Sequence, residues 1–95
     1  MKSGKEILDR LLTSEAKGEI LTLYHKNPGL VDTLDGVGRR IGKRREQIKT
    51  DVDDFIEMGI LKKITVGKLD LYGLDAQRDQ EIQLSIADYF RSLKK

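Results

Sequence analysis

The sequence predicts an α+β domain that is mainly helical and carries one small β-hairpin. Apolar residues recur at helical spacing along most of the chain, and they alternate with polar residues only around residues 62–72. Leu, Ile, Val and Phe together far exceed the roughly 20% below which chains of high net charge stay disordered. A length of 95 residues suits one compact domain. We therefore expect a single folded domain over residues 1–95.

Five helices are expected, at residues 5–12, 15–25, 34–41, 44–58 and 76–93. Ser14, Thr33 and Asp75 precede three of them and are residue types that cap helix N-termini. The helix over residues 44–58 is different, because its N-cap position falls on Lys43, which is not a capping residue. We expect this helix to begin without the usual side-chain cap.

The alternating segment predicts a hairpin over residues 62–72. A two-residue type II′ turn at Gly67 and Lys68 is expected, because glycine suits its first position. This turn fixes the register and places four apolar side chains on one face, which we expect to be buried. They are Ile64, Val66, Leu69 and Leu71.

Positive charge is concentrated in one segment, although the formal net charge is only +2. Residues 39–49 hold six bases and one acid, whereas residues 50–61 hold four acids and no base. Cations at a helix start oppose the helix dipole, by about 0.3–1 kcal/mol each. Free backbone N–H groups and guanidinium groups at such a position are suited to bind phosphate. An anionic partner therefore explains this segment better than an ordinary solvated run of charge.

Three fragments, taken in order, resemble a winged helix-turn-helix DNA-binding domain of the kind found in small archaeal and bacterial transcription regulators. They are VGRRIG at residues 37–42, IKTDV at 48–52 and FIEMGIL at 55–61. The resemblance covers residues 14–75 and implies a recognition helix at 44–58 and a short wing at 62–72. Residues 1–13 and 76–95 lie outside the resemblance and are expected to form flanking helices.

The resemblance implies contacts with double-stranded DNA and a role in transcription regulation. Phosphates would be bound by a basic patch that consists of Arg39, Arg40, Lys43, Arg44 and Arg45. Bases would be read or flanked by Glu46, Gln47, Lys49 and Thr50. Lys63 and Lys68 would contact DNA from the wing, although protection of a strand edge explains these lysines as well.

Acidic side chains on the same helix leave a second function open. The outward face is expected to continue through Asp53, Asp54 and Glu57, and Asp51 lies nearby; we call these four residues the acidic patch. They depart from a uniformly basic recognition helix. A winged-helix protein adaptor would use them to bind a basic partner.

An enzyme is not expected. The chain has no cysteine and one histidine, and it shows no nucleophile–base pair, metal-ligand spacing or phosphate-binding loop. We expect no metal and no cofactor. The longest apolar run is far shorter than the ~20 residues needed to span a bilayer, and the N-terminus lacks the apolar stretch of a signal peptide. A cytoplasmic protein is therefore expected.

The last helix is longer than the core of a small winged domain needs, and the first helix also has an apolar face. We expect a two-fold homodimer built from these end helices. The alternative is that they cover each other within one chain. The residues expected at the dimer contact are Ile82, Ile86, Tyr89, Phe90 and Leu93.

Overall fold

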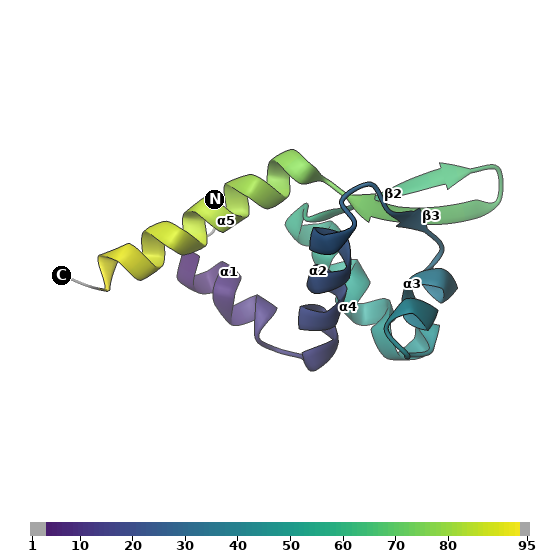
Figure 1. The fold of residues 1–95 in the computed structure, drawn as a ribbon, viewed down its shortest axis with the longest axis horizontal. Helices are drawn as coiled ribbons and strands as arrows, with labels where there is room; N and C mark the ends of the chain where they lie inside the picture. Colours follow the sequence, from purple (N-terminus) through teal and green to yellow (C-terminus); the bar gives the residue numbers. More distant parts are fainter. Residues whose placement is uncertain (1–3, 94–95) are drawn as a thin grey trace.

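The computed structural model describes residues 4–93, which form five helices and a three-stranded antiparallel sheet (Figure 1). The helices are α1 (Gly4–Leu11), α2 (Glu15–Lys26), α3 (Leu34–Arg40), α4 (Arg45–Met58) and α5 (Ala76–Ser92). The strands are β1 (Val31–Asp32), β2 (Leu61–Val66) and β3 (Leu69–Leu74), in the order β1-β3-β2. The expected α+β fold class is confirmed.

Local sequence sets the helix boundaries. The side chains of Ser14, Thr33 and Asp75 each accept a hydrogen bond from the backbone N–H three residues further on, which confirms the three expected N-caps. In α4 the expected N-cap is wrong by one residue, because Arg44 rather than Lys43 takes the extended N-cap conformation. Fewer cations therefore lie inside the first turn of α4 than the sequence suggested.

The hairpin has the expected register but not the expected burial. β2 and β3 pair around a turn at Gly67 and Lys68, which confirms the register. The four apolar side chains that it aligns form what we call the outer wing face: Ile64, Val66, Leu69 and Leu71. Val66 and Leu69 at the tip are 60% and 51% exposed, whereas Ile64 and Leu71 are half-buried, so the expectation of a buried face is wrong at the tip. The opposite face enters the core instead, near the base of the hairpin, through Leu61, Tyr72 and Leu74.

A third strand, which the sequence did not predict, joins the sheet to the helices. β1 pairs Val31 with Gly73 and Asp32 with Tyr72. The fully buried Tyr24 of α2 donates its hydroxyl hydrogen to the carbonyl oxygen of Tyr72 at 2.8 Å. Burial raises the pKa of Tyr24 to about 12, so this hydroxyl stays a donor and holds α2 on the sheet.

A single hydrophobic core connects the five helices to the sheet. Its central side chains are fully or almost fully buried and come mainly from α2, α3 and α4: Ile20, Tyr24, Val37, Ile48, Val52 and Phe55. Ile7 of α1 and Ile82 of α5 belong to the same core. The end helices therefore contribute to the core that positions α4.

The end helices α1 and α5 pack on each other at one end of the molecule, opposite the wing (Figure 1). A Cβ atom at Gly4 would collide with the carbonyl oxygen of Ser85, so only glycine allows this close approach. The buried Asp79 carboxylate near the start of α5 lies 3.0 Å from His25 Nε2 of α2 and accepts a hydrogen bond from Gln83.

None of the helices within residues 4–93 has the length and apolar character required to cross a membrane.

Candidate nucleic-acid interface

A tight turn between α3 and α4 brings four of the five residues of the basic patch together, whereas Arg40 lines a separate hollow against α2. Gly38 lies directly against the carbonyl oxygen of Lys43, where a Cβ atom would come too close, and its own carbonyl accepts the N–H of Lys43 at 2.8 Å. Beside this turn is a hollow of about 270 Å³, lined by Asp35, Arg39, Lys43, Arg44, Arg45 and Glu46. Four of the six lining side chains are cationic.

The start of α4 leaves backbone donors available beside these cations. The Arg44 side chain has no acceptor with which to cap the helix. The backbone N–H of Arg44 itself donates to the side-chain oxygen of Gln47 at 2.8 Å. The N–H groups of Arg45 and Glu46 have no intrahelical carbonyl to bind, as at any helix start. Free N–H groups next to guanidinium groups form an arrangement suited to a phosphate oxygen.

The cations of the interface differ in whether a carboxylate already pairs with them. Four form ion pairs: Arg40 with Asp32 at 3.2 Å, Lys43 with Glu19 at 3.4 Å, Arg45 with Asp35 at 3.6 Å, and Lys49 with Asp53 at 3.0 Å. The pairs of Arg45 and Lys49 are exposed on both sides, and such pairs contribute only about 0–1 kcal/mol, so they exchange readily for phosphate contacts. The pairs of Arg40 and Lys43 are partly buried. Within residues 4–93 no ion pair is formed by Arg39, Arg44, Lys63 or Lys68.

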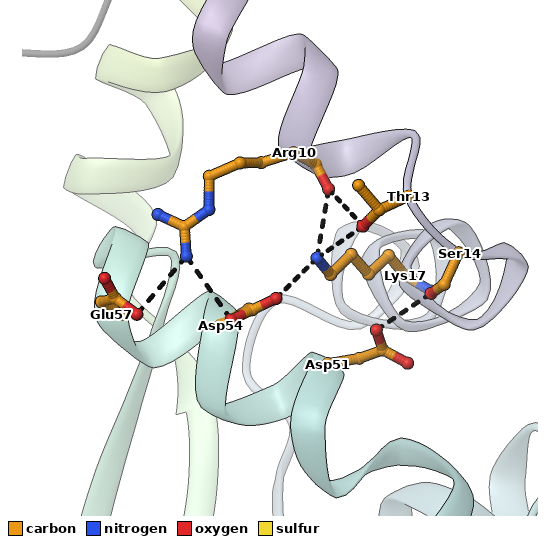
Figure 2. A network of polar contacts seen from close by, with 7 residues as sticks. All are labelled: Arg10, Thr13, Ser14, Lys17, Asp51, Asp54 and Glu57. Carbon is orange, nitrogen blue, oxygen red and sulfur yellow. Dashed lines mark hydrogen bonds and ion pairs between the residues drawn. The ribbon is translucent and has the colours of Figure 1, made fainter.

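The outward face of α4 matches the expected one except at Asp54. The side chains expected to meet bases are all exposed: Glu46, Gln47, Lys49 and Thr50. Asp54 is only partly exposed and faces α1 and α2 (Figure 2). The expectation that it faces outward is wrong, because Asp54 bonds to Arg10 of α1 and Lys17 of α2.

Figure 2 shows the contacts that hold this flank of α4 on α1 and α2. The Lys17 side chain is 3% exposed, and its ammonium group has three acceptors for its three hydrogens. They are Asp54 Oδ2 at 2.8 Å, Thr13 Oγ1 at 2.9 Å and the Arg10 carbonyl oxygen at 3.1 Å. The hydrogen bond from Lys17 holds the pKa of the Asp54 carboxyl below its usual value.

The remaining acids of the acidic patch also have partners within the chain. The Arg10 guanidinium donates to Asp54 and Glu57, each at 3.5 Å, and the Ser14 hydroxyl donates to Asp51 at 3.0 Å. Asp53 pairs with Lys49, as described above. The acidic patch is therefore largely engaged by the protein's own α1 and α2.

Sequence reasoning missed Lys17 and Arg10. A signal for Lys17 was present, because this lysine shares the apolar stripe of α2 with Ile20 and Tyr24. A lysine in such a stripe needs a buried acceptor, since an unpaired buried charge is strongly unfavourable. Nothing in the sequence indicated that Asp54 supplies that acceptor.

The remaining predicted residues lie apart from α4. Lys68 is in the hairpin turn, and Lys63 lies on β2, an outer strand of the sheet. Protection of that edge and contact with DNA thus remain alternative explanations for these lysines. Among the residues expected at a dimer contact, Ile82 and Ile86 face the chain's own core and Tyr89 is partly buried. Phe90 and Leu93 are 49% and 60% exposed.

Comparison with known proteins identifies the fold. No family model and no curated protein matches this chain. The crystal structure of the AntR antimony-specific transcriptional repressor is similar, with a TM-score of 0.61 and 12% identity, over 94% of this chain and 78% of that one. A possible transcriptional regulator from Methanosarcina mazei Go1 is similar with a TM-score of 0.67 and 13% identity, over 95% of this chain and 82% of that one. The chain therefore has a fold that transcriptional regulators share.

Proposed function

We propose that this protein is a transcriptional regulator that binds double-stranded DNA sequence-specifically, with α4 in the major groove. The observation that carries the proposal is the start of α4, where exposed cations surround a hollow beside free backbone N–H groups. The basic patch binds phosphates, and Glu46, Gln47, Lys49 and Thr50 meet or flank the bases. Lys63 and Lys68 contact the DNA from the wing.

The adaptor alternative is less well supported, because Asp51 and Asp54 of the acidic patch are engaged in contacts with α2. Asp54 is bonded to the buried Lys17, and Asp51 and Glu57 are bonded to Ser14 and Arg10. A docking protein would have to displace contacts that hold α4 on α1 and α2. These acids serve the fold, so the exposed basic side chains remain the stronger candidates for binding a partner.

The test is binding to mixed-sequence duplex DNA at several salt concentrations. Five or six phosphate contacts give a slope of about −4.5 to −5.4 in a plot of log affinity against log salt. Arg44→Ala is expected to weaken binding to all sequences alike and to flatten that slope by about 1. Lys5→Ala, an exposed lysine of α1 outside the interface, is the control and leaves the slope unchanged. No binding at low salt would favour the adaptor alternative.

We also propose that the regulator is a two-fold homodimer that binds two half-sites about one helical turn apart. Its support is the pair Phe90 and Leu93 near the end of α5, which stay 49% and 60% exposed after α5 has packed on α1. Sedimentation equilibrium at tens of micromolar should give a dimer mass. Changing Phe90 and Leu93 together to Ser should give a folded monomer, with folding checked by circular dichroism. A monomer mass for the unchanged chain would contradict the homodimer.

A further inference from the structure

The tip of the hairpin carries an apolar pair that the core does not cover. Val66 and Leu69 pair across β2 and β3 directly beside the two-residue turn, and they are 60% and 51% exposed. Neither side chain is part of the hydrophobic core. Exposed apolar side chains that lie together are typical of binding surfaces. The tip is therefore a candidate binding surface.

The charges near this pair favour an anionic partner. Lys68 lies in the turn beside Leu69 and forms no ion pair within residues 4–93. Asp70, the acid of the two strands, pairs with Thr65 and accepts its hydroxyl hydrogen at 2.8 Å. Successive side chains of a strand point to opposite faces, so Asp70 points away from the face that carries Val66 and Leu69. That face combines apolar groups with a lysine at its edge.

The tip lies at the end of the molecule that carries much of the proposed DNA interface. Figure 1 shows the hairpin extending beyond the helices, with α3 at the same end. Arg39 and Arg40 of the basic patch belong to α3. In the proposed function Lys68 contacts the DNA, and Leu69 is its neighbour in the chain, with Cα atoms about 3.8 Å apart. A DNA contact of Lys68 therefore brings the apolar pair to the DNA as well.

Apolar side chains gain nothing from phosphates, but the faces of stacked bases are apolar and can cover them. Proteins that bind the minor groove insert apolar wedges, leucine among them, between neighbouring bases, which partly unstacks the bases and kinks the duplex. The proposed function places α4 in the major groove and so leaves the minor groove to the wing. We propose that the wing tip inserts Leu69, flanked by Val66, between neighbouring bases in the minor groove and bends the DNA. This inference rests on the proposed function and adds bending to it.

The test is ligase-catalysed ring closure of a duplex of about 100 base pairs. Such a duplex is shorter than the DNA persistence length of about 150 base pairs and closes rarely on its own. The assay requires no known target sequence. The full chain should raise the yield of rings at protein concentrations that saturate the duplex.

Three variants separate the apolar wedge from the charge beside it, with folding checked by circular dichroism. Leu69→Thr keeps a residue suited to a strand but removes the wedge. It should abolish the gain in ring yield and leave the slope of log affinity against log salt unchanged, because no cation is lost. Lys68→Ala should flatten that slope by about 1. Leu84→Thr removes a leucine of α5 that is 56% exposed, and as the matched control it should leave the ring yield unchanged.

The possible failures are distinguishable. Binding of DNA without a gain in ring yield, or equal ring yields for Leu69→Thr and the unchanged protein, would overturn the inference and leave the proposed function intact. A loss of ring yield in Leu84→Thr as well would overturn it, because the effect would not belong to the tip. An unchanged slope for Lys68→Ala would overturn it too, because the tip would not reach the DNA. A chain that binds no DNA overturns the proposed function itself.

Discussion

The first and second halves of α4 differ in charge and in surroundings. The first half begins with the exposed Arg44 and Arg45, with backbone donors open to solvent. The second half carries three of the four residues of the acidic patch, and one of them, Asp54, bonds to a buried lysine of α2. Acids that depart from the basic character expected of a recognition helix therefore attach α4 to the rest of the domain. The sign of a charge is informative about function only once its partners are known.

The largest expected effect is a loss of folding stability when the contact between the second half of α4 and α2 is removed. Asp54→Ala leaves the ammonium group of Lys17 buried without a carboxylate, which is expected to lower the free energy of unfolding by about 3 kcal/mol. This is the low end of the range for such changes, because the Asp54 side chain is one-third exposed. Urea denaturation measures the loss.

Asp53→Ala is the matched control, because Asp53 is the adjacent acid and forms only an exposed pair with Lys49. Its expected loss is about 0.3–0.5 kcal/mol. Similar losses for the two variants would show that the buried contacts of Asp54 do not stabilise the domain, and the distinction between the two halves of α4 would fail.

The next largest expected effect is a change in DNA sequence preference, caused by a substitution in the first half of α4. Gln47→Glu keeps the side-chain oxygen that accepts the Arg44 N–H but removes the amide donor that would meet a base. We expect unchanged stability and a change in preference of about 1–3 kcal/mol at one base pair, measured by competition among duplexes. Gln47→Ala loses the oxygen as well and should also lower stability. If Gln47→Glu weakened binding to every duplex equally, Gln47 would not lie against the bases.

Acid should remove the contribution of Asp54 to stability. Its pKa is lowered in the folded state, so the stabilisation is fully present above the unfolded pKa of about 3.9 and is lost as the pH falls through the folded value. The stability gap between the unchanged protein and Asp54→Asn is therefore expected to narrow below about pH 4. Denaturation curves from pH 7 to pH 2 test this. A gap that stays constant over that range would contradict it.

The smallest expected effect is a gain in DNA affinity when Arg45, at the start of α4, is released from its ion pair. Asp35→Asn removes the acid that pairs with Arg45 at 3.6 Å and lines the hollow beside it. Releasing an exposed pair of this kind is expected to strengthen DNA binding by about 0.2–1 kcal/mol. Fluorescence anisotropy at low salt measures the change, with Asp88→Asn as the control far from the basic patch. Weaker binding of Asp35→Asn would show that Arg45 is not a phosphate contact.

The features that the sequence predicted depend on neighbouring residues. The caps at Ser14, Thr33 and Asp75 involve groups three residues apart, and the register of the hairpin follows from its two-residue turn. The basic patch could also be predicted from the sequence, because its five residues lie within residues 39–45.

The features that were missed depend on contacts between distant segments. The two-residue strand β1 is too short to show an alternating pattern, and it forms because β3 offers it a free edge. Lys17 and Asp54 are 37 residues apart, so only the packing of α2 on α4 brings them together. The pocket between α1, the end of α4 and α5 is likewise lined by residues from the start, the middle and the end of the chain. Alternation in the hairpin identified two faces but not which of them the helices cover.

The outer wing face has a consequence for motion. Near its base the hairpin is held by Leu61 and Tyr72 in the core, whereas its tip is held by main-chain bonds and by the cross-strand pair of Val66 and Leu69. A segment with few buried contacts opens locally at low free energy. Amide hydrogens near Gly67 should therefore exchange with solvent faster than those near Tyr72. Such a gradient lets the tip fray and re-form while the base of the hairpin keeps its place beside α4.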